Sequence, residues 1–209
     1  MSKDDEPAQE RGKYRPLSYF QLMEVTLREL LVEKALITED DVARQVENLR
    51  ARTPERGAKV VARAWVDADF QKRLIENGTK ACEELGLDVA PMRLVVVENT
   101  PQVHNVIVCT LCSCYPRPLL GIPPDWYKSR SYRSRMVREP RAVLKEFGLE
   151  MKDEIQIRVH DSTADMRYMV LPMRPAGTDG WSEDKLAALV NRDSMIGVAV
   201  PIVPKSKVG

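Results

Sequence analysis

The sequence contains no apolar run near the roughly 20 residues that a bilayer-spanning helix needs. Its 32 Lys and Arg against 31 Asp and Glu leave a net charge of only +1. Such a balance gives no general attraction to nucleic acid or to anionic membranes. The first sixteen residues, MSKDDEPAQERGKYRP, are charged where a signal peptide would be apolar. We therefore expect a cytoplasmic protein with neither a membrane nor a nucleic acid as its partner.

Cysteine and histidine are scarce, with four and two residues respectively. A structural zinc site usually takes four such ligands from two separated pairs. Here Cys109, Cys112 and Cys114 crowd into one short segment, and no second pair follows. An iron-sulfur cluster would also lack its fourth thiolate. The ordinary zinc and iron-sulfur sites are therefore each one ligand short, and Cys82 is expected to pack in a helix instead.

The first half of the chain predicts helices. Ser18 and Gln21 form a capping-box pattern ahead of apolar residues at helical spacing, and Thr38 precedes three acidic residues that favour a helix start. Shorter helices are expected over 58–65, 67–76 and 79–85, each next to a glycine. We predict a mobile arm over 1–16, a helical extension contacting a partner subunit over 17–56, a metal-binding catalytic domain over 57–201 and a tail over 202–209.

The second half adds strands. Apolar and β-branched runs predict strands over 94–97 and 103–108, and alternation predicts a half-buried pair over 155–159 and 168–171. Prolines between 116 and 124 exclude regular structure until a helix near Trp126, and a final strand is expected over 196–200. The predicted fold class is α+β: the N-terminal helical extension, then a layered α/β/β/α domain with a metal claw at a strand end.

The claw, residues 109–114, has the spacing C-x2-C-x-C directly after a predicted strand. Three sulfurs on one tight turn could bind a metal if the amide nitrogens of Ser113 and Cys114 also serve as ligands. Three thiolates and two deprotonated amides suit trivalent cobalt or iron and leave one open position for Lewis-acid chemistry. The alternative is that the three cysteines are inert and buried.

The sequence around the claw resembles a known family. Val-Cys-Thr-Leu-Cys-Ser-Cys-Tyr-Pro at 108–116 and Leu-Gly-Ile-Pro-Pro-Asp-Trp-Tyr-Lys at 120–128 are similar to the nitrile hydratase alpha subunit and to the related thiocyanate hydrolase gamma subunit. The three-subunit, toyocamycin-type nitrile hydratases belong to the same group. The similarity covers about residues 18–200 and includes, in order, the segments 57–61, 64–65, 132–135, 138–141, 166–168, 174–182 and 194–197.

The resemblance implies a ligand set and two modifications. Cys109, Cys112 and Cys114 would bind the metal with the amides of Ser113 and Cys114, while Cys112 becomes a sulfinate and Cys114 a sulfenate. Threonine at position 110 goes with non-corrin Co(III) in this family, and serine there with Fe(III). The implied partners are a beta-type subunit, in one chain or two, an activator protein that delivers the metal, and a small nitrile.

The implied reaction is the hydration of a nitrile to its amide. Either the sulfenate oxygen of Cys114 or a base-assisted water attacks the nitrile carbon. Asp161 and Asp165 align with acidic positions of the family, although Asp165 is shorter than the usual Glu and both residues also suit a turn. The alternative is that the chain is not an enzyme but a scaffold subunit that only binds metal.

Arg117 departs from the cobalt nitrile hydratases, which commonly have Trp there. Thiocyanate hydrolase has Arg in this place, so a substrate-binding role for Arg117 favours either thiocyanate or a polar nitrile. A neutral nitrile is our preferred substrate because the segment 86–100 is short, as in the nitrile hydratases, whereas thiocyanate hydrolase has a longer segment there. The seven basic residues between 128 and 145 are expected at a subunit interface or on a solvated face. Neither His104 nor His160 is expected to be catalytic.

Overall fold

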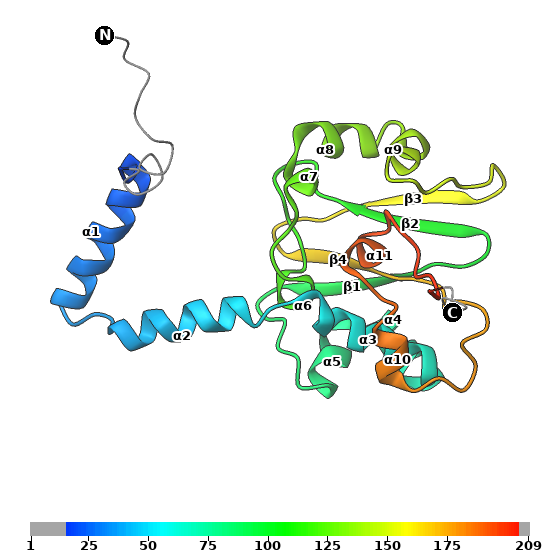
Figure 1. The fold of residues 1–209 in the computed structure, drawn as a ribbon, viewed down its shortest axis with the longest axis horizontal. Helices are drawn as coiled ribbons and strands as arrows, with labels where there is room; N and C mark the ends of the chain where they lie inside the picture. Colours follow the sequence, from blue (N-terminus) through cyan, green and yellow to red (C-terminus); the bar gives the residue numbers. More distant parts are fainter. Residues whose placement is uncertain (1–15, 205–209) are drawn as a thin grey trace, which may run out of the picture. The chain divides into compact units, whose positions relative to one another are not determined.

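The computed structural model describes residues 16–204 (Figure 1). By its internal contacts the chain forms two compact units, one ending at Asn48 and one starting at Leu49. Most of the predicted arm (1–16) and the end of the predicted tail (202–209) lie outside the described residues. The expected boundary between extension and metal-binding domain stays a prediction. No helix in the described part is long and apolar enough to cross a membrane.

The first unit holds α1 (Tyr19–Glu33) and most of α2 (Glu39–Arg50). The predicted capping box is present, because Ser18 Oγ accepts from the Gln21 amide while the Gln21 side chain accepts from the Ser18 amide. Neither helix has a buried residue. The solvent-exposed apolar side chains of α1 are Tyr19, Phe20, Leu22, Met23, Leu27 and Leu30.

The second unit begins with α3 (Pro54–Val66), α4 (Ala68–Glu76) and α5 (Gly78–Glu84). Side-chain caps separate these helices: Asp67 accepts from the first amides of α4, and Asn77 accepts from the Lys80 amide of α5. The apolar face of α3 is buried, including Val60 and Val61. Cys82 is fully buried in α5, as expected.

Two parallel two-stranded sheets follow. β1 (Arg93–Glu98) pairs with β4 (Met166–Leu171), and β2 (Val103–Val108) pairs with β3 (Gln156–Asp161). The expected pairing of β3 with β4 is therefore wrong, although both strands are partly buried. The short connection between them carries the chain from one sheet to the other, and each strand finds its partner earlier in the sequence.

The sheets lie between two layers of helices, which confirms the α/β/β/α arrangement (Figure 1). Along the β2–β3 side lie α8 (Arg130–Met136) and α9 (Pro140–Glu146), and along the β1–β4 side lie α3, α4, α5 and α10 (Glu183–Ala187). A short helix, α6 (Arg117–Leu120), forms inside the proline-rich segment, for which the sequence predicts no regular structure ahead of α7 (Asp125–Lys128). Its prolines occupy the first turn, where a missing amide costs no helical bond.

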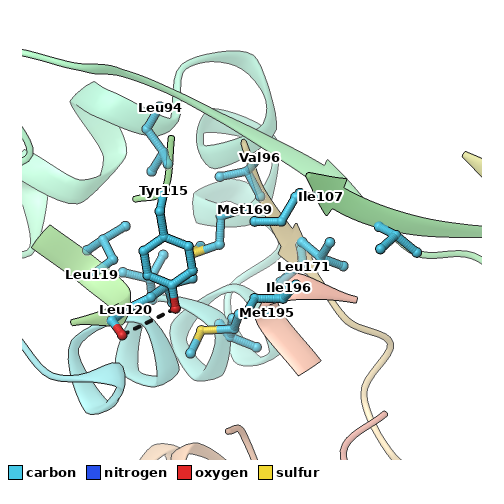
Figure 2. Close-up of a cluster of buried hydrophobic side chains, with 14 of the residues drawn as sticks. Leu94, Val96, Ile107, Tyr115, Leu119, Leu120, Met169, Leu171, Met195 and Ile196 are labelled. Atoms are coloured by element: carbon cyan, nitrogen blue, oxygen red, sulfur yellow. Dashed lines mark hydrogen bonds between the residues drawn. The ribbon is translucent and has the colours of Figure 1, made fainter. Parts of the chain in front are cut away.

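The strand predicted over 196–200 is absent. Its first residue, Ile196, is instead the last residue of α11 (Arg192–Ile196). Asn191 and Ser194 cap this helix reciprocally, and Gly197 ends it with φ +94°. A side chain at Gly197 would place its Cβ 2.1 Å from the Asn105 carbonyl oxygen of β2. α11 packs against β2, β4 and α3. Its residues Met195 and Ile196 join side chains of β1, β2, β4 and α6 in one core (Figure 2).

Candidate metal centre

The claw follows β2 without a break. Cys109 comes directly after the strand and is fully buried, Cys112 is exposed, and Cys114 is 9% exposed. The Cys112 sulfur lies 3.6 Å from that of Cys109 and 3.3 Å from that of Cys114. All three sulfurs lie within 4.8 Å of one another. The turn therefore gathers three soft ligands at one point at the end of a strand.

Asp161 holds the start of the claw. The β2–β3 register sets Asp161 beside Val108, so its side chain reaches the turn that follows. One carboxylate oxygen accepts from the Thr110 amide at 2.9 Å, and the other accepts from the Thr110 hydroxyl. On another side, Arg133 Nη1 donates to the Thr110 carbonyl oxygen at 3.3 Å. Position 110 is thus fixed through its amide, hydroxyl and carbonyl groups.

Two buried tyrosines hold the backbone, one at the end of the claw and one in the strand before it. The Tyr127 hydroxyl donates to the Cys114 carbonyl oxygen at 2.9 Å, and the Tyr132 hydroxyl donates to the Ile107 carbonyl oxygen at 2.8 Å. Burial raises the pKa of both hydroxyls, so they stay protonated donors. Sequence reasoning missed them, because a tyrosine in a short helix carries no local sign of what its hydroxyl contacts.

The pKa values of Cys112 and Cys114 are shifted in opposite directions. The pKa of Cys112 is lowered by a hydrogen bond from Cys114 and then by the Ser113 amide. The pKa of Cys114 is raised to about 12, first by burial and then by its cysteine neighbours. Among the described residues, neither the Ser113 nor the Cys114 amide donates to a carbonyl or side-chain oxygen. Three gathered sulfurs fit the donor set expected for trivalent cobalt or iron, together with the Ser113 and Cys114 amides, which are directed to the Cys112 sulfur.

A pocket of about 520 Å³ opens beside the claw. Cys112, Ser113 and Cys114 form part of its wall, together with Asp165. The pocket also has three arginines in its wall, namely Arg52, Arg117 and Arg167. Asp161 is not among the lining residues, so the two candidate carboxylates have different surroundings. Sequence reasoning named Arg117 but missed Arg52 and Arg167, which are far away in the chain.

The basic segment 128–145 is largely engaged within the chain. Arg135 pairs with Glu139 and Glu146, and Lys128 pairs with Asp125. The Arg141 guanidinium donates to backbone carbonyl oxygens ahead of β3. These contacts hold several of the basic side chains against their own chain.

The two histidines belong to a polar network away from the pocket. His104 Nε2 lies 2.7 Å from the Gly197 carbonyl oxygen, and His160 Nε2 lies 2.8 Å from Asn105 Oδ1. Burial is the main cause that lowers the pKa of both rings. Neither histidine lines the pocket beside the claw, and each ring bonds a buried polar group instead.

The fold and the cysteine cluster together match one family of enzyme subunits. The family model for "Nitrile hydratase, alpha chain" matches residues 18–199. The chain therefore belongs to the nitrile hydratase alpha chain family.

Relatives within this family are named for two activities, nitrile hydratase and thiocyanate hydrolase. The chain is 53% identical over 175 residues to the cobalt-containing nitrile hydratase subunit alpha of Pseudonocardia thermophila, covering 82% of this chain and 86% of that protein. It is 45% identical over 197 residues to the thiocyanate hydrolase subunit gamma of Thiobacillus thioparus, covering 88% and 81%.

Solved structures agree with the fold. A recombinant thiocyanate hydrolase with partially modified cobalt centres superposes with a TM-score of 0.83 at 42% identity, covering 93% of this chain and 100% of that chain. A double mutant of the Fe-type nitrile hydratase of Comamonas testosteroni Ni1 gives a TM-score of 0.84 at 43% identity, covering 93% and 98%. The same backbone therefore serves members named for either metal and for either substrate.

Proposed function

We propose that this chain is the metal-bearing alpha subunit of a nitrile hydratase and that it hydrates a nitrile to its amide. The observation that carries the proposal is the claw itself. Three sulfurs lie within 4.8 Å of one another beside a pocket of about 520 Å³, in a chain of this family. A pocket wall made of metal ligands places a substrate directly against the metal position.

Cobalt is the proposed metal. Cys109, Cys112 and Cys114 would hold it through sulfur, and Ser113 and Cys114 through their amide nitrogens. When bound, Co(III) supplies a Lewis acid that polarises the nitrile carbon. The cobalt-containing relatives support this choice over iron, as does Thr110.

Residues of this chain would then position and assist the attack. Asp161 and Tyr127 hold the two ends of the claw, so the ligands keep one geometry during turnover. Asp165, in the pocket wall, is the proposed base that takes a proton from water. The attacking oxygen is either that water or the sulfenate oxygen of Cys114.

We propose that Cys112 matures to a sulfinate and Cys114 to a sulfenate. Cys112 is exposed, whereas Cys114 is 9% exposed, so oxygen-transferring reagents reach Cys112 more easily. This difference agrees with the higher oxidation level at Cys112.

The proposed partner is a beta-type subunit, in one chain or two, with an activator protein delivering cobalt. Amphipathic helices need an apolar counterpart, and the apolar residues of α1 are exposed in this chain. Oxidised cysteines also need cationic hydrogen-bond donors when they are buried. We therefore place the extension 17–56 against the partner.

A second candidate is a thiocyanate hydrolase gamma subunit. Arg117 in the pocket wall favours it, since a guanidinium attracts an anion. The 45% identity to the Thiobacillus thioparus subunit also supports it.

The test uses the chain co-expressed with its partner subunits. We expect one cobalt per chain, amide formation from a nitrile panel, and mass additions for a sulfinate and a sulfenate on the claw peptide. Cys114→Ala should remove all three, whereas Cys82→Ala, a matched change at a buried cysteine outside the claw, should keep them. Stoichiometric zinc or no metal would contradict the proposal. Carbonyl sulfide from thiocyanate, without amide from any nitrile, would establish the second candidate.

A further inference from the structure

The pocket beside the claw gathers positive charge from three distant parts of the chain. Arg52 precedes α3, Arg117 begins α6, and Arg167 lies in β4. Asp165 is the only carboxylate among the described residues of the pocket wall. The fold therefore creates a local excess of cations, although the net charge of the whole chain is close to zero. Neutral nitriles have no need of such a wall.

These cations have no anionic partner in the described part of the chain. Among residues 16–204, the side chains of Arg52, Arg117 and Arg167 make no ion pair and donate no hydrogen bond, and the Nη1 atom of Arg167 is buried without a partner. Elsewhere in the same unit, Arg63, Arg73 and Arg135 each pair with a glutamate. Arginines that line one pocket and have no partner among the described residues are suited to bind an anion there.

The size of the pocket indicates which anion. A volume of about 520 Å³ lies within the range of pockets that hold small organic ligands. Thiocyanate is triatomic and would leave most of that space filled with water. A ring or chain that carries both a nitrile and an anionic group would use the space, with the nitrile at the claw and the anion at the arginines.

We propose that this pocket selects nitriles that carry a carboxylate, with Arg52 and Arg117 as the residues that bind that group. The inference rests on the proposed function, because it names the substrate class of the same site. The reaction adds water across the carbon–nitrogen triple bond to give the amide, and the carboxylate passes through unchanged.

The test compares two substrates of the same shape on the cobalt-loaded complex: para-cyanobenzoate and the neutral para-cyanobenzamide. A charge-assisted hydrogen bond predicts a kcat/KM about tenfold higher for the benzoate. The higher kcat/KM of the benzoate should come from a lower KM. The difference between the two substrates should shrink as salt is added, since salt screens exposed charges. Isothermal titration with benzoate should show binding in competition with the substrate.

Variants assign the effect to residues. Arg52→Gln and Arg117→Gln should each reduce the preference for the benzoate severalfold and weaken benzoate binding, while Arg117→Lys should retain part of both. Arg158→Gln removes the same charge from an exposed position of β3, where the side chain bonds only Gln156. It should keep the full preference, which excludes an effect of net charge.

Each failure has its own meaning. Equal kcat/KM for the two nitriles would overturn the substrate class and leave the proposed function standing. A preference that survives both Arg→Gln changes would overturn the assignment to Arg52 and Arg117. No amide from either nitrile would overturn the proposed function itself, and carbonyl sulfide from thiocyanate in that experiment would assign the charged pocket to thiocyanate instead.

Discussion

Replacing Tyr127 by phenylalanine tests whether the tyrosine anchor keeps the claw in place. The change removes one hydroxyl that donates to the Cys114 carbonyl oxygen at 2.9 Å and leaves the ring packed against Tyr115, at 5.0 Å between centroids. Tyr127 is fully buried, so no water replaces the lost donor. An unsatisfied buried acceptor costs about 1–3 kcal/mol. We expect the free energy of unfolding to fall by that amount and cobalt to dissociate faster, because Cys114 supplies two of the proposed ligands.

Tyr132→Phe is the matched control. Its hydroxyl donates to the Ile107 carbonyl oxygen at 2.8 Å, and the side chain is 5% exposed. The loss of stability should therefore be similar, but Ile107 lies inside β2, and cobalt retention should be unchanged. Urea unfolding of the purified chain gives the first quantity, and cobalt content of the complex during dialysis against a chelator gives the second. If Tyr127→Phe loses stability but holds cobalt as firmly as Tyr132→Phe, the anchoring role of Tyr127 is refuted.

Further predictions concern glycine, histidine and cysteine positions. Gly197→Ala should abolish soluble folded chain or cost more than about 4 kcal/mol, because its Cβ would lie 2.1 Å from the Asn105 carbonyl oxygen at a positive φ; expression and thermal melting check this. The pKa of His104 is lowered by burial, so the unfolded chain binds the extra proton. The pKa of His160 is lowered in the same way. Stability should therefore fall as the pH drops below about 6.5, with a slope of up to about 1.4 kcal/mol per pH unit from each histidine, and a flat urea midpoint between pH 7.5 and 5.5 would contradict it. In the metal-free chain, iodoacetamide should label Cys112 first, since it is exposed and its pKa is lowered, whereas burial raises the pKa of Cys82 to about 12 and should keep it unlabelled until the chain unfolds; peptide mass spectrometry before and after denaturation decides it.

Local sequence was sufficient for the features that depend on neighbours in the chain. Ser18 and Gln21 cap α1 because a capping box involves residues only three positions apart. The claw is also local: its three cysteines lie within six residues, close enough for their sulfurs to meet in one tight turn. The cysteine spacing and its flanking residues are therefore enough to indicate both the metal site and the family.

Only the tertiary structure decided which strands pair and what surrounds the claw. The alternation in β3 showed that one face is buried, but not that its partner is β2, because period-two patterning carries no partner identity. Asp161 meets Thr110 across 51 positions of sequence, and Tyr127 meets Cys114 through a hydroxyl whose direction depends on packing. Arg52, Arg117 and Arg167 share one pocket because the starts of α3, α6 and β4 come together there. Contacts of this kind depend on how distant segments pack, so they cannot be predicted from any short stretch of sequence.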